Sequence, residues 1–129
     1  MKNTLNIGKA VYAILSNDNN TKKLVKNAIY PLVANHGEKF PFITYTRTSL
    51  TPNRTKDSIA ETTAMIEIDV YSDKYKSVAE VATSVFEALE GFEGEAGGFN
   101  IDEVTLEDAS EEFDDDTFKE SLIFKFEIL

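Results

Sequence analysis

Hydrophobic residues recur at helical spacing in two parts of the chain. From Asn3 to about Asn17 they occupy the i, i+4, i+7 and i+8 positions of a helix that buries one face. Asn3 is a plausible N-cap, because its side chain can accept a hydrogen bond from a free backbone N–H of the first turn. A second stripe runs from about Lys74 to Leu89, and Gly91 suits a left-handed cap after it. A shorter helical turn is expected from Thr21 to about Asn27.

Four further segments alternate between hydrophobic and polar residues, which predicts β-strands. They run from Phe42 to about Leu50, from Thr62 to Tyr71, from Phe99 to Leu106 and from Phe118 to Leu129. Residues 51–58 hold almost no hydrophobic side chain, so a long polar loop is expected between the first two strands. Long loops are often functional or mobile. Arg54 and Lys56 give this loop a positive tip, which could be solvated or could contact a partner.

The predicted order is helix, strand, strand, helix, strand, strand. Consecutive strands joined by short or polar links favour antiparallel pairing. Two amphipathic helices can cover one face of such a sheet, giving two layers. The chain is therefore expected to form one α+β domain over residues 1–129, with a mainly antiparallel four-stranded sheet and two main helices on one face. A length of 129 residues agrees with a single domain.

The net charge of −10 is unevenly spread along the chain. Residues 1–76 carry 11 Lys and Arg against 7 Asp and Glu, a net charge of +4, whereas residues 77–129 carry 2 against 16, a net charge of −14. Such acidity argues against sequence-specific or general binding of nucleic acid, which requires a positive surface. No hydrophobic stretch approaches the ~20 residues that cross a bilayer, so no membrane association is expected.

The densest run of acids lies between Asp102 and Asp116, where nine of fifteen residues are acidic. Within it, Asp114, Asp115 and Asp116 raise the possibility of a calcium site. The run lacks the alternating ligands, the central Gly and the final Glu of an EF-hand loop. A solvated hairpin loop is therefore expected there, with no metal.

No arrangement of residues points to catalysis. The chain has no Cys, and its one histidine, His36, lies in a predicted turn without partners at a known spacing. Glu67 and Asp69 share one face of a predicted strand, where a solvated sheet surface is expected rather than an acid–base pair. The sequence thus predicts a protein that is not an enzyme and binds no cofactor.

The segment from Ile29 to Tyr45 resembles a family of small tailed-phage proteins. These are the tail completion, or tail terminator-like, proteins encoded near the head–tail connector genes. The likeness is carried by Ile29-Tyr30-Pro31, Gly37, Phe40-Pro41-Phe42-Ile43 and Tyr45. Residues 66–72 then fit the family's second strand, and residues 74–75 and 78–89 resemble the helix after it. The acidic segment after Gly91 departs from the family pattern.

The resemblance implies an α+β sheet with helices on one side. It also implies a structural protein without a cofactor that completes or terminates the tail tube at the head–tail joint, as a ring of identical subunits. Its partners would be further copies of itself and phage tail-tube or head–tail connector proteins. It would reside in the virion, and in the host bacterial cytoplasm during assembly. The alternative is a small, non-enzymatic binding or adaptor domain of a bacterial protein.

The uneven charge suggests how copies could meet. Head-to-tail contacts between identical subunits close into rings when the rotation allows, and complementary potentials fix their register. We therefore expect the loop with Arg54 and Lys56 to meet acidic residues of the next subunit or of a tail protein, with Asp114, Asp115 and Asp116 as candidates. A second hypothesis is that acidic side chains line a lumen through which DNA passes.

Overall fold

The computed structural model describes residues 3–129, apart from the side chain of Ile59. Its helices are a 3-10 turn η1 (Thr4–Asn6), α1 (Gly8–Asn17), α2 (Asn19–Val25) and α3 (Tyr75–Leu89). Its strands are β1 (Ile29–Pro31), β2 (Phe42–Arg54), β3 (Ile59–Ser72), β4 (Gly94–Ala96), β5 (Phe99–Asp114) and β6 (Thr117–Ile128). Asn3 caps η1 through its side chain, which accepts from the backbone N–H of Leu5 at 3.1 Å.

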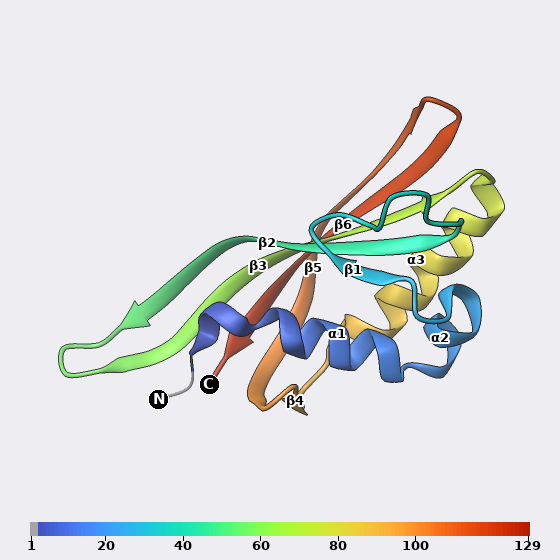
Figure 1. Ribbon diagram of the computed structural model, residues 1–129. Helices are drawn as coiled ribbons and strands as arrows, with labels where there is room; N and C mark the ends of the chain where they lie inside the picture. Colours follow the sequence, from blue (N-terminus) through green and yellow to red (C-terminus); the bar gives the residue numbers. More distant parts are fainter. Residues whose placement is uncertain (1–2) are drawn as a thin grey trace.

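The strands form one six-stranded sheet in the order β1-β2-β3-β6-β5-β4 (Figure 1). β1 pairs with β2 in parallel, whereas the other neighbours are antiparallel. The sheet is strongly twisted and curls like half a barrel, with the helices against one face. The predicted fold class, a four-stranded antiparallel sheet with two main helices, is therefore wrong. The sequence missed β1 and β4 because they have 3 residues each, too few to show an alternation.

The hairpin of β2 and β3 extends beyond the helices as an arm, which we call the basic arm (residues 48–63) after Arg54 and Lys56 at its tip, although Asp57 and Glu61 balance their charge. Thr62 is buried, and the other described side chains of this arm are exposed or half-buried. The expected loop over residues 51–58 is shorter in the structure and spans only residues 55–58, because β2 continues to Arg54 and β3 begins at Ile59. A turn joins them, in which the backbone N–H of Thr55 donates to the carbonyl of Ser58 at 2.7 Å.

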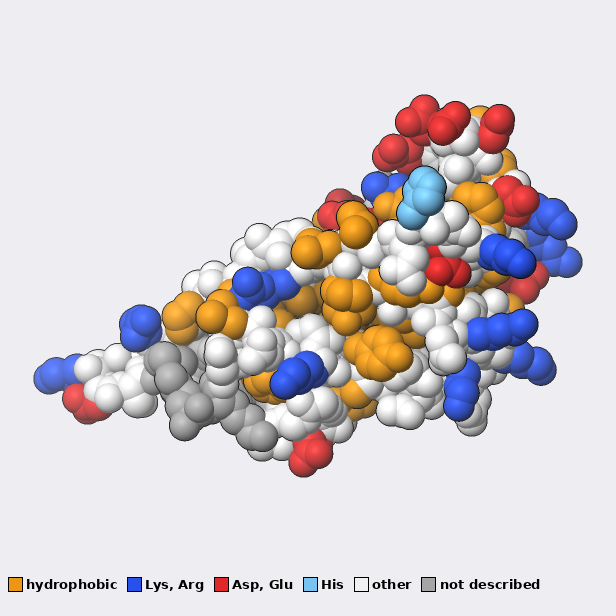
Figure 2. Space-filling model, in the orientation of Figure 1, with side chains coloured by type: hydrophobic (Ala, Val, Ile, Leu, Met, Phe, Trp, Pro, Cys, Tyr) orange, Lys and Arg blue, Asp and Glu red, His pale blue; other side chains and the backbone are white. Residues whose placement is uncertain are grey.

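The hairpin of β5 and β6 forms a second arm, which we call the acidic arm (residues 107–120). The acidic segment was expected to be a loop, but it continues β5 as far as Asp114 and pairs with β6. Asp115 and Asp116 form the turn, with φ of 50° and 58°. Two residues with positive φ are the signature of a tight hairpin turn, and Asp enters this region more readily than most residues. Acidic side chains gather at the end of this arm (Figure 2).

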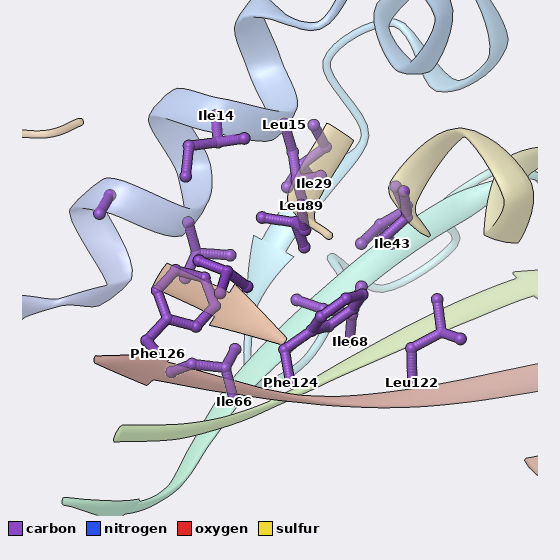
Figure 3. Packing of buried hydrophobic residues seen from close by; sticks show 14 of the residues in the cluster. Ile14, Leu15, Ile29, Ile43, Ile66, Ile68, Leu89, Leu122, Phe124 and Phe126 are labelled. Carbon is purple, nitrogen blue, oxygen red and sulfur yellow. The ribbon is translucent and has the colours of Figure 1, made fainter. Parts of the chain in front are cut away.

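The hydrophobic core lies between the helices and the curled face of the sheet (Figure 3). Ile66 and Ile68 of β3, and Phe124 and Phe126 of β6, are each at most 1% exposed. Burial follows every second residue in both strands, which confirms the alternation in the sequence. The helices contribute a buried stripe at the predicted spacing: Ala10, Val11, Ile14 and Leu15 in α1, and Val78, Val81, Ala82, Val85 and Leu89 in α3.

Two glycines determine how β4 and β5 meet helix α1. Gly97 and Gly98 form the turn between these strands, with φ of 57° and 85°. Gly97 lies directly against the helix, because a Cβ atom added to it would be 2.6 Å from the backbone nitrogen of Ala10. Glycine is thus required here both for its conformation and for its lack of a side chain. Among residues 3–129, no helix is both long and hydrophobic enough to cross a membrane.

Candidate assembly interface

The basic and acidic arms lie at opposite ends of the molecule (Figure 1). In the pairing of β3 with β6, Thr62 faces Ile128 at one end and Ser72 faces Phe118 at the other. The basic tip lies beyond the first of these pairs and the acidic tip beyond the second. Ten residues of extended strand, about 33 Å, separate the two pairs. The tips therefore cannot touch each other within one chain.

The basic tip carries two of the residues predicted from the sequence, Arg54 and Lys56, and both are exposed. Within the described residues neither takes part in an ion pair. The turn beneath them is fixed by the hydroxyl of Thr55, which accepts from the backbone N–H of Ser58 at 3.1 Å. Both cations thus project from an ordered hairpin, and Figure 2 shows Lys and Arg side chains at this tip beside an acidic one.

The acidic tip carries the other three predicted residues, Asp114, Asp115 and Asp116, and all three are exposed. The structure brings them together in a single turn. In the part of the chain that the structure describes, no group of three or more His, Cys, Asp or Glu side chains could hold a metal ion. His36 is exposed within a turn. The observed geometry therefore gives a charged protein surface at this tip, without a metal-ligand cluster.

Aromatic side chains lie close to the turn of the acidic arm, and sequence reasoning missed them. The Phe113 and Phe118 ring centroids lie 4.6 Å apart, and those of Tyr75 and Phe118 lie 5.8 Å apart. With Glu111 and Glu112 they line a pocket of about 210 Å³, which we call the aromatic notch. Phe113 is 58% exposed and Tyr75 53% exposed. The only indication of the notch in the sequence is Phe113, a large hydrophobic residue within the acidic run.

Like charges face each other across the acidic arm. Glu111 of β5 is paired with Glu120 of β6, whereas the neighbouring Glu112 is paired with Lys119. Like charges in directly opposed positions destabilise a sheet. Burial and the nearby Glu111 carboxylate raise the pKa of Glu120. The arm of an isolated subunit therefore holds one unfavourable charge pair that a nearby positive charge would relieve.

The sheet surface around Glu67 and Asp69 is less solvated than the sequence predicted. Asp69 is 7% exposed rather than solvated, and its Oδ1 atom has no hydrogen-bond partner among the described residues. A hydrogen bond with Asp69, together with burial, raises the pKa of Glu67. The nearby Lys119 acts in the opposite direction on the pKa of Glu67, and both carboxyl groups raise the pKa of Lys119.

We predict that the protein becomes more stable as the pH falls from 7 toward 5. The pKa values of Glu61, Glu67 and Glu120 are raised above the ordinary 4.5, for Glu61 by burial and the nearby Asp102. A carboxyl group with a raised pKa binds its proton more tightly in the folded state, so folding gains stability as the pH falls through the raised pKa. Thermal unfolding followed by circular dichroism at pH 7, 6 and 5 measures this.

The variant Glu61→Gln with Glu120→Gln serves as the control for this pH dependence. It removes two of the three groups, so its melting temperature should change less between pH 7 and 5. A wild-type melting temperature that falls steadily over that interval would contradict the prediction.

The fold and its surface define a class of protein. It is a curled-sheet subunit with two projecting hairpin arms, of which one carries Arg54 and Lys56 at its tip and the other is strongly acidic. The model of the tail completion protein gp17 family matches residues 9–129, and the chain belongs to this family. It is therefore a structural protein of phage-like tails, as the resemblance in the sequence implied. As a tail component it is part of the virion and associates with other tail or head proteins.

One solved structure with a similar fold is a chain in the virion of a native gene transfer agent particle. The two chains share 18% sequence identity and superimpose with a TM-score of 0.79, covering 92% of this chain and 91% of that chain. A search of curated proteins finds no match. Family membership favours a phage tail protein over the alternative of a bacterial adaptor domain. The family is a structural one, and the lack of catalysis in this chain stays a prediction.

Proposed function

We propose that this protein completes the tail tube at the head–tail joint, as a ring of identical subunits. Each subunit would act as one domain over residues 1–129. The ring would assemble in the host bacterial cytoplasm, where its partners would be tail-tube and head–tail connector proteins. Membership of the tail completion protein gp17 family is the observation that carries this function.

The positions of the two arms support the ring. A contact between different surfaces of identical subunits generates a ring when the rotation closes. Such a contact needs two complementary surfaces facing away from each other on one molecule. The basic tip with Arg54 and Lys56 and the acidic tip with Asp114, Asp115 and Asp116 meet this requirement. In the ring, the basic tip of one subunit would lie against the acidic arm of the next.

Purified tail tubes made without this protein provide the test. Negative-stain electron microscopy should show a ring at one end of the tubes after the protein is added, and capped tubes should then join filled heads. Tubes incubated with an unrelated acidic protein of similar size serve as the control. Bare tube ends at saturating concentrations of the protein would refute the proposed function.

A further inference from the structure

We propose that the aromatic notch receives the Arg54 side chain from the basic tip of a second copy of this chain. This inference rests on the proposed ring and specifies its contact. The tips by themselves would supply only exposed charge. The notch adds a shaped surface, made by Tyr75, Phe113 and Phe118 together with Glu111 and Glu112.

The size of the notch favours a side chain over a free small molecule. Its volume is about 210 Å³, whereas ligand pockets typically enclose about 300–1,000 Å³. Tyr75 and Phe113 expose more than half of their surface. Large aromatic residues exposed side by side on a soluble protein mark contact surfaces. Aromatic residues are also those that most often anchor protein interfaces.

The chemistry of the notch selects a guanidinium group. Glu111 shares the strand face of Phe113, and Glu120 lies directly opposite it, whereas Glu112 is paired with Lys119. Arginine can pair with a carboxylate through two parallel hydrogen bonds and can stack on an aromatic ring at the same time. Tyr75 and Glu111 both line the notch, and the nearby Glu111 carboxylate raises the pKa of the Tyr75 hydroxyl.

One cation of the chain already borders the notch. Lys119 follows Phe118 in β6, and its ammonium lies 5.8 Å from the centroid of the Tyr71 ring. Successive residues of a strand point to opposite faces. Lys119 is thus directed to the open face of the sheet, and the aromatic side of the notch stays available for a cation from outside.

The basic tip is the complementary surface on the same molecule. Arg54 ends strand β2 at the opposite end of the sheet from the notch, exposed and without an ion pair within residues 3–129. One chain cannot bring its own Arg54 to its own notch, whereas the next subunit of a ring can. Lys56, close to Arg54, would also be attracted to the acidic arm, but its ammonium group lacks the planar shape that lets a guanidinium group stack on an aromatic ring.

Cysteine cross-linking tests this contact directly, because the chain has no cysteine of its own. The variant Lys56→Cys with Thr117→Cys keeps Arg54 and all three aromatic rings, and places one thiol beside each surface. A short bismaleimide added to tube-bound rings should yield a ladder of covalent oligomers on a denaturing gel. The variant Lys22→Cys with Thr117→Cys is the matched control, since Lys22 is an exposed residue of α2. A ladder no stronger than in this control, from rings seen by microscopy, would overturn the contact.

A charge exchange gives a second, independent measurement. Arg54→Glu with Lys56→Glu should lower the yield of capped tubes at least about tenfold, because like charges would then face each other, and so should Glu111→Lys with Glu112→Lys. All four substitutions in one chain should restore capping. Lys22→Glu with Lys23→Glu changes the net charge equally and should leave capping intact.

The two proposals fail in different ways. Wild-type rings that cap tubes, together with reversed variants that cap equally well, would refute the contact and leave the function standing. An absence of capping by the wild-type protein would refute the function itself.

Discussion

Gly97→Ala is expected to lower the free energy of unfolding by about 3 kcal/mol, through backbone strain and overpacking together. Gly97 has φ of 57°, a conformation that disfavours any residue with a Cβ atom. The added methyl group would also lie 2.6 Å from the backbone nitrogen of Ala10 and 2.6 Å from the carbonyl carbon of Lys9. Neither backbone atom can turn aside as a flexible side chain would. Helix α1 must therefore shift away from the β4–β5 turn.

Gly91→Ala is the matched control for this substitution. Gly91 has φ of 75°, but a Cβ atom there would meet no atom within 4 Å. It should therefore show the strain alone, a loss of about 1 kcal/mol. Urea unfolding of both variants measures the difference. Equal losses would mean that helix α1 does not rest against Gly97 in solution.

The long central strands could be predicted because each has one buried and one open face. Residues 62–71 were expected as a strand and lie inside β3, and residues 118–129 nearly coincide with β6. Their hydrophobic residues alternate because one face packs on the core. The alternation in the sequence therefore follows the alternation of buried and exposed positions in the strand.

The arms could not be predicted, since both of their faces meet water. Residues 51–54 and 107–114 are strand in the structure, although they show no alternation of hydrophobic residues. Pairing with a neighbouring strand keeps them extended, and the local sequence pattern does not predict this pairing. The charge of the tips was visible in the sequence, but their separation to opposite ends follows only from the sheet order.

The aromatic notch could not be predicted from the sequence either. Tyr75 begins α3, whereas Phe113 and Phe118 lie on a hairpin far along the chain. Each residue alone suggests only a core or surface aromatic. The pairing of β3 with β6 brings Phe118 beside Ser72, just before α3, and so places the three rings together. A site assembled by topology in this way leaves no motif in the sequence.

Asp115→Asn with Asp116→Gly is expected to stabilise the acidic arm and yet slow assembly on the tail. Both positions have positive φ, where Asn-Gly is the preferred pair of a two-residue hairpin turn. Relief of backbone strain should raise the free energy of unfolding by about 0.5–1 kcal/mol. The same change removes two negative charges from the acidic tip. Because charged surfaces steer encounter, the association rate should fall about tenfold at low ionic strength.

Light scattering on mixing with tail tubes measures this association rate, and denaturant unfolding measures the stability. The control is Asp57→Asn with Glu61→Gln, which removes two negative charges from the basic arm and should not slow association. The difference between the variants should shrink as salt is added, because exposed charges are screened beyond about 10 Å at 0.1 M salt. A variant that gains stability and associates at the wild-type rate at low salt would show that the acidic tip does not guide the subunits together. Asn-Gly would make this turn more stable than the two Asp residues do. The presence of Asp at both positions is what we expect if selection has favoured docking over stability.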